Sequence, residues 1–178
     1  IVLIENNGSA GYTITIQTPS LEISSVRIKD QEFVELEAQT DGLTGEPGLP
    51  ALPTFSRWIE VPAGTTPSNS FFTGSESFIS DINIAPFPHV NDDYPNIAEP
   101  APQTIAYTAR DFYYPTETAS VSEPILVGTK YMALVDIFPY QYNAAQKQLR
   151  IYEDIEISVS FEASPKFNND MSRRSAPV

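Results

Sequence analysis

The alternation of apolar and polar side chains near the end of this 178-residue sequence is the feature that most constrains its fold. Between positions 149 and 161 the apolar side chains share one parity and the polar ones take the other. The apolar set is Leu149, Ile151, Ile155, Ile157, Val159 and Phe161, and the polar set is Arg150, Asp154, Glu156, Ser158 and Ser160. Successive side chains leave a strand on opposite faces, so a period of two indicates a half-buried strand. An aromatic and β-branched run precedes it, separated by the polar Asn143–Gln148, which predicts a long antiparallel hairpin over Tyr131–Phe161.

The rest of the chain is also typical of strands joined by rigid loops. It holds 16 prolines, 10 phenylalanines and 9 tyrosines, a composition that disfavours helices. Strands are predicted at residues 12–16, 21–28, 33–38, 55–61 and 78–84. The glycine- and proline-rich segment 40–53 is expected to run as an extended crossover. The predicted class is all-β, an antiparallel β-sandwich or flattened barrel with a long C-terminal hairpin, forming one domain over 1–164 followed by a flexible tail at 165–178.

Charge and composition narrow the possible partners. The formal net charge is −13, from 23 acidic and 10 basic side chains, and there is no cysteine. An acidic chain is repelled by phosphate backbones and anionic lipids, so we expect neither a nucleic acid nor a membrane as partner. The acidity favours solubility or docking to a basic protein face. The lack of cysteine is compatible with export, although no signal peptide is visible in this sequence.

Side chains that carry chemistry are few. His89 is the only histidine, and its acidic neighbours Asp92 and Asp93 are too close in sequence to complete a tetrahedral zinc site with it. An exposed loop histidine is the simpler interpretation. No serine lies in a nucleophile elbow, and no glycine loop is suited to phosphate. We therefore expect no catalytic residues, no cofactor and no metal. The proline-rich connection 85–104, which has no clear periodicity, is a candidate functional loop.

Three groups of residues resemble a known family. The first is Phe138–Asn143 followed by Lys147–Tyr152, the second is Gly45–Pro53 followed by Ser56–Pro62, and the third is Ile84-Ala85-Pro86 with Tyr113-Tyr114-Pro115. In this order, over roughly residues 30 to 162, they resemble the gingipain-type propeptides, the N-terminal pro-domains of family C25 cysteine peptidases.

The resemblance implies a function for a chain without catalytic residues of its own. Pro-domains of that family cover the active site of the catalytic domain, keep the zymogen latent and assist its folding. The partner would then be the catalytic domain of the cognate C25-type cysteine peptidase, and the protein would be secreted or at the cell surface after export through the periplasm. The alternative functions are a secreted β-sandwich adhesion or structural module with no protease partner, or a carbohydrate-binding module, for which Tyr113-Tyr114 is the only hint.

The same resemblance points to an inhibitory residue. In the family, a residue between the Ile-Ala-Pro and the aromatic-Pro segments enters the specificity pocket of the peptidase, and in the best-known members it is basic. Counting without gaps places its equivalent at Asp92 or Asp93. An acidic residue there implies a partner with a basic pocket. If the alignment slips, His89 or Arg110 takes the role instead.

The end of the chain offers a processing site. Arg173 and Arg174 lie in the predicted tail 165–178, which has the polar composition of a flexible segment. An Arg-directed protease reaches such a segment with little local unfolding. The simpler interpretation is that two basic residues only aid solubility.

Overall fold

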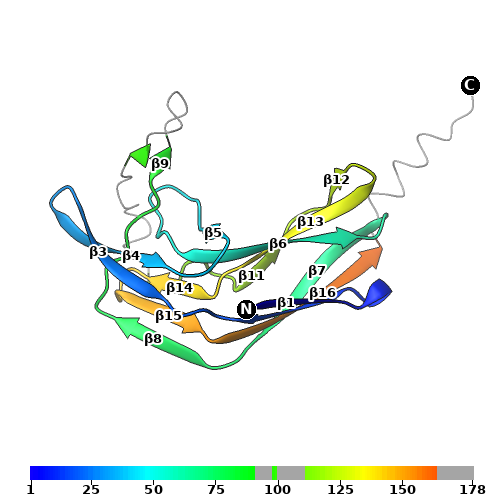
Figure 1. Ribbon diagram of the computed structural model, residues 1–178, viewed down its shortest axis with the longest axis horizontal. Coiled ribbons are helices and arrows are strands. Elements are labelled where there is room, and N and C mark those ends of the chain that lie inside the picture. The colour runs from blue at the N-terminus through cyan, green and yellow to red at the C-terminus, as the bar shows by residue number, and fades with distance from the viewer. Residues whose placement is uncertain (91–97, 100–110, 164–178) are drawn as a thin grey trace, which may run out of the picture.

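The computed structural model describes residues 1–90, 98–99 and 111–163. Within them, regular structure is β-strand apart from one short 3-10 turn, η1 (Gly8–Ala10). The predicted all-β class is confirmed, and none of the sheets closes into a barrel. A sandwich is therefore the correct one of the two predicted architectures. Figure 1 shows the strands arranged in a long, bent body whose upper side is concave.

Two open sheets form one half of the body. The first has the order β1-β2-β16-β7, with β1 at Val2–Asn6, β2 at Tyr12–Gln17, β16 at Asp154–Ala163 and β7 at Thr65–Thr73. The second has the order β11-β13-β6-β5, with β12 also paired to β13. Its strands are β11 at Ala119–Val121, β13 at Lys130–Ile137, β6 at Pro53–Val61, β5 at Gly42–Leu43 and β12 at Ile125–Val127. Every pairing in both sheets is antiparallel.

The main core lies between these two sheets and is called core 1. The first sheet contributes Ile14, Ile16, Ile155, Ile157 and Val159, and the second contributes Phe55, Ile59, Val61, Ala133, Val135 and Ile137. These positions alternate along their strands, so each sheet buries one face and leaves the other outward. Core 1 is therefore the centre of the predicted sandwich.

A second, smaller core lies at the other end of the body and is called core 2. A three-stranded sheet of β14 (Tyr140–Asn143), β15 (Gln148–Tyr152) and β8 (Glu76–Ser80) lies beside the hairpin of β3 (Glu22–Ile28) and β4 (Gln31–Glu37). Its buried side chains are Leu36, Leu52, Ile84, Tyr140, Tyr142 and Leu149. The Tyr140 hydroxyl donates to the Pro19 carbonyl at 2.8 Å, and burial raises the pKa of Tyr140 to about 12. The hydroxyl therefore stays protonated and keeps this buried hydrogen bond.

The predicted long hairpin is shorter in the structure than in the sequence-based prediction. Only β14 and β15 pair with each other, from Tyr140↔Ile151 to Asn143↔Gln148. Beyond them the two arms separate, because β13 pairs with β6 and β16 pairs with β2 and β7. The alternating residues consequently serve two cores, with Leu149 in core 2 and Ile157 in core 1. The alternation correctly predicted which face each side chain takes, but it carries no information about the partner strand.

The glycine- and proline-rich segment also differs from its prediction. Residues 40–53 fold back on themselves, since Gly42 and Leu43 pair with Thr54 and Pro53. The Thr44 hydroxyl closes this loop by donating to the Pro50 carbonyl at 2.6 Å and accepting from the Leu52 N–H at 3.0 Å. Because these hydrogen bonds are local, the segment forms a compact loop against core 2, and the expectation of an extended crossover is wrong.

Candidate functional site

The candidate functional loop leaves the body after Ile84–Phe87 and returns at Asp111–Pro115. Between these two stems, β9 (His89–Val90) and β10 (Ala98–Glu99) pair antiparallel. Figure 1 shows β9 projecting from the concave side of the molecule, above β5. The loop therefore begins as a two-stranded ribbon.

The outgoing stem is held between two neighbours. On one side the Ala85 N–H donates to the Val34 carbonyl of β4 at 2.9 Å. On the other side the Gly/Pro-rich loop contributes three hydrogen bonds: Ala51 N–H to the Ala85 carbonyl at 3.0 Å, Phe87 N–H to the Leu49 carbonyl at 2.7 Å, and Gly48 N–H to the Phe87 carbonyl at 3.1 Å. Ile84 is buried in core 2. The stem is thus hydrogen-bonded to two neighbouring segments, as a strand inside a sheet is, and these bonds fix its path.

The returning stem is anchored to the hairpin of β14 and β15. Tyr114 and Tyr142 exchange both backbone hydrogen bonds, at 2.9 and 2.8 Å. The Asp111 carboxylate accepts from Asn143 Nδ2 at 2.6 Å and from Gln146 Nε2 at 2.8 Å. Burial, with help from Glu46, raises the pKa of Tyr114. The Tyr114–Pro115 peptide bond is cis. The hydrogen bonds of Asp111 and Tyr114 therefore fix the stem at its first described residue and near its end.

Arg150 of β15 contacts the same stem on the face of the three-stranded sheet that points away from core 2. Its guanidinium carbon lies 3.8 Å from the centre of the Tyr113 ring, and its Nη1 donates to the Tyr152 hydroxyl at 3.0 Å. Its Nε is 3.4 Å from the Glu76 carboxylate. Burial alone would lower the pKa of Arg150, but the Tyr152 hydroxyl, Tyr113 and Glu76 outweigh it and the pKa is raised. Arg150 is therefore a fixed positive charge.

The three sequence motifs meet at the base of this loop. The Ile84-Ala85-Pro86 and Tyr113-Tyr114-Pro115 motifs are its two stems, the Gly/Pro-rich motif braces the first, and the hairpin motif braces the second. Nothing in the sequence showed that motifs up to about a hundred residues apart converge. The three motifs therefore form one structural unit at the base of the loop.

Of the predicted site residues, only His89 lies in the described parts of the chain. His89 is on β9, exposed, and its backbone pairs with Glu99. Asp92, Asp93, Arg110, Arg173 and Arg174 lie outside the described residues, so their roles stay predictions. Within residues 1–90, 98–99 and 111–163, no three His, Cys, Asp or Glu side chains are grouped to hold a metal ion. The same ranges hold no helix long and apolar enough to cross a membrane.

The outward faces of the two sandwich sheets differ in chemistry. The central strands of the first sheet present small polar and acidic side chains, such as Thr15, Glu156 and Ser158, and its edge strands add the exposed Leu3 and Phe72. The second presents Trp58, which is 52% exposed, beside its cross-strand neighbour Leu134. We call Trp58, Met132, Leu134 and Ile125 the apolar face, since register places them on one side of that sheet.

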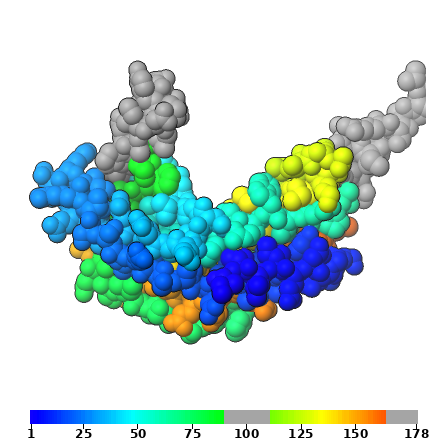
Figure 2. All heavy atoms as spheres, viewed as in Figure 1, coloured from blue at the N-terminus to red at the C-terminus, as the bar shows by residue number. Residues whose placement is uncertain are grey.

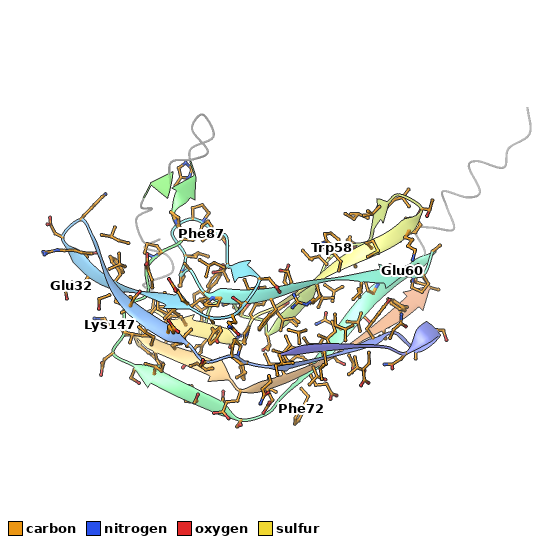
Figure 3. The ribbon with its side chains drawn as sticks, viewed as in Figure 1. Glu32, Trp58, Glu60, Phe72, Phe87 and Lys147 are labelled. Carbon is orange, nitrogen blue, oxygen red and sulfur yellow. The ribbon has the colours of Figure 1, made fainter. Side chains whose placement is uncertain are left out.

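The apolar face lies on the same side of the molecule as the loop. Figure 3 shows Trp58 and Phe87 on the concave upper side and Phe72 on the opposite side. Figure 2 shows that this side is hollowed between β9 and β12. Next to the loop base, an open recess of about 300 Å³ is lined by residues that include Leu43, Tyr114 and Asp136. In the strand predicted at residues 55–61, alternation alone places Trp58 on the opposite face from Ile59 and Val61, but nothing in the sequence suggested a binding role for it.

A braced loop beside an apolar face on a stiff sandwich is the arrangement of a domain that binds another protein. The chain belongs to the Propeptide_C25 family, whose model matches residues 1–173. The resemblance seen in the sequence is thereby confirmed, and the chain is a non-catalytic pro-domain of the gingipain type.

Individual relatives agree with this assignment. Gingipain R2 from Porphyromonas gingivalis is 33% identical over 129 residues, which cover 68% of this chain and 17% of that protein. A structure concerning the zymogenic latency of gingipain K, also from Porphyromonas gingivalis, matches with a TM-score of 0.77 and 24% identity, covering 91% of this chain and 92% of that one. A complex of the RgpB pro- and mature domains of that organism matches with a TM-score of 0.75 and 23% identity, covering 97% and 95%. The chain spans 10% to 17% of the length of the curated gingipains it matches.

Proposed function

We propose that this chain is the inhibitory propeptide of a gingipain-like cysteine peptidase, that it covers the active site to keep the zymogen latent, and that it assists folding of the catalytic domain. The observation that carries the proposal is the bracing of both loop stems by hydrogen bonds to separate elements of the body. A loop that occupies a substrate cleft without being turned over needs a fixed shape before binding, because ordering it on binding would cost affinity. The solved complex of RgpB pro- and mature domains supports the same partner for this chain.

Docking would use two contacts on the concave side. The loop enters the cleft, and the apolar face around Trp58 rests on the surface beside it. A stable interface of standard size buries about 1,600 Å² in total, which a loop alone does not provide. The net charge of −13 favours a basic partner surface around these contacts. As part of such a precursor, the chain would be exported through the periplasm and act outside the cell or at its surface.

The identity of the residue in the specificity pocket is tested by an inhibition assay. The 178-residue chain is added to the catalytic domain of its own precursor, and wild type is compared with Asp92→Ala, Asp93→Ala, His89→Ala and Arg110→Ala. The residue in the pocket is expected to cost 2 kcal/mol or more, roughly thirtyfold in inhibition constant, as for a central interface residue. We expect that loss at Asp92 or Asp93.

The other outcomes are equally clear. A thirtyfold loss at His89 or Arg110 with unchanged aspartate variants would show that the alignment slips and that the pocket is not basic. A wild-type chain that leaves the peptidase fully active at micromolar concentration would contradict the proposed function itself.

Processing at the end of the chain is a separate expectation. Cleavage after Arg173 or Arg174 is expected during maturation, because the polar composition of residues 165–178 predicts a flexible segment that a protease reaches with little local unfolding. Mass spectrometry of the matured protein should find a new terminus at one of these residues. Normal maturation of a precursor with alanine at both positions would rule this site out.

A further inference from the structure

We propose that Arg150 is a positioning residue for the inhibitory loop: by stacking on Tyr113 it locks the returning stem, so that the loop acts as an inhibitor and is not cut as a substrate. This inference rests on the proposed function. Arg150 lies in the hairpin motif and Tyr113 in the stem motif, 37 positions apart in sequence, and nothing in the sequence pattern connects them.

The returning stem makes contacts on both of its faces. Phe112 and Tyr114 pack against core 2, whereas Tyr113 lies over Arg150, which is on the opposite face of β15 from the buried Leu149. The Tyr113 hydroxyl also donates to the Gln148 side chain. A guanidinium 3.8 Å from a ring centroid is a close cation–π contact. Tyr113 is thus held between a planar cation and a hydrogen-bond acceptor, both on β15.

The position of Arg150 is a poor choice for stability alone. Its Nε is buried and makes no hydrogen bond to the described residues, and its ion pair with Glu76 is long, at 3.4 Å. An apolar side chain of similar length would fill the space between Phe78 and Tyr152 without leaving a buried donor unpaired. What an apolar side chain lacks is the pair of hydrogen bonds from Nη1 to the Tyr152 hydroxyl and the Gln141 side-chain carbonyl oxygen, at 3.0 and 3.4 Å, and the attraction to the Tyr113 ring.

A fixed stem matters because peptide hydrolysis is sensitive to small displacements. A bound peptide is cut only when its carbonyl reaches attack distance and alignment with the nucleophile, and a misplacement of about 1 Å changes rates by about a hundredfold. A loop with one loose stem reaches geometries in which its backbone can be cut. It also binds less tightly, because the loop must then be ordered on binding. Loosening Tyr113 is therefore expected to raise the inhibition constant and the rate of cleavage together.

The test uses Arg150→Met, which keeps the length and packing of the side chain and removes the cation. The variant chain is added to the catalytic domain of its own precursor, and the inhibition constant and the cleavage of the chain between residues 88 and 111, followed by mass spectrometry over time, are compared with wild type. We expect the inhibition constant to rise about tenfold and cleavage to become detectable, with an unchanged thermal midpoint. Tyr113→Leu should give the same two effects, and Arg150→Met added to it should have little further effect, because the two side chains act as one contact.

Arg57→Met is the matched control. Arg57 also lies over a ring, that of Phe55 at 5.8 Å, and pairs with an acid, Asp41. Within the described residues, these interactions and its hydrogen bond to the Ser56 carbonyl involve neither stem. Arg57→Met should inhibit as wild type does. If wild type inhibits and Arg150→Met inhibits equally and stays uncut, the inference is overturned. If Arg150→Met lowers the thermal midpoint, the double variant with Tyr113→Leu provides the test. Effects of the two substitutions on the inhibition constant that simply add would also overturn the inference. Failure of wild type to inhibit would instead contradict the proposed function.

Discussion

Replacing Ile157 by aspartate is expected to abolish cooperative unfolding of the chain. Ile157 is fully buried in core 1, on the central strand β16, between Ile14 of β2 and Phe71 of β7 in the register. The substitution removes a large apolar side chain and places a carboxyl group where no water reaches, which together cost more than about 4 kcal/mol. That is a large share of the 5 to 15 kcal/mol by which domains are stable. Thermal unfolding followed by circular dichroism measures the loss.

Two further variants sharpen this test. Ser158→Asp, one residue along on the outward face, should change the free energy of unfolding by less than about 0.5 kcal/mol. Leu149→Asp breaks core 2, where Leu149 is likewise fully buried. We expect it to be as damaging, because the continuous chain from β13 to β16 links both cores. An unchanged thermal midpoint for Ile157→Asp would mean that the faces of β16 are assigned the wrong way round.

The second large effect is expected on binding. Trp58→Ala should weaken the affinity for the catalytic domain by 2 kcal/mol or more, roughly thirtyfold, because a half-exposed tryptophan beside Leu134 on the outward side of a sheet is a typical interface hot spot. Stability should change little, since the side chain lies outside core 1. Calorimetric titration of each variant into an active-site-blocked catalytic domain measures the effect.

Phe72→Ala is the matched control for Trp58. Phe72 is 71% exposed but lies on the opposite side of the molecule, on β7. It should bind as wild type does. Fluorine NMR of chain labelled with fluorotryptophan adds a direct observation, since Trp58 is the only tryptophan and gives a single signal. A signal that does not move on saturation with the catalytic domain would exclude the apolar face as a contact.

The sequence predicted the local features of the fold well. The strands predicted at residues 21–28 and 33–38 are present as β3 and β4, which pair across a turn with Lys29 at φ 55°. The strand predicted at residues 55–61 is present within β6, and its alternation agrees with the exposed Trp58 and the buried Ile59 and Val61. Such features depend on residues close in sequence, so a pattern read along the chain contains them.

Pairing between distant strands was not predictable in the same way. The partner of β13 is β6, seventy or more positions earlier, and alternation only specifies a face. The base of the loop was missed for the same reason, since its hydrogen bonds join Leu49 to Phe87 and Tyr114 to Tyr142. The role of Arg150 could not be predicted, because an arginine on the polar side of a strand is common and only the fold brings the Tyr113 ring over it. The pocket residue and the processing site remain predictions from the resemblance.

The position of β16 has a consequence for how the chain reaches this fold. β16 covers residues 154–163 and lies between β2 and β7, and no other strand joins these two in the described part of the chain. During synthesis, or during passage through a narrow channel from the N-terminal end, β2 and β7 emerge long before the strand that unites them. Contacts between residues 14 and 157 close a very long loop, which is slow to form. Until β16 arrives, Ile14 and Ile16 have no neighbour on that edge, and the first sheet exists only as separate pieces. We therefore expect the sandwich to form late and in one step, once the last of its strands is available.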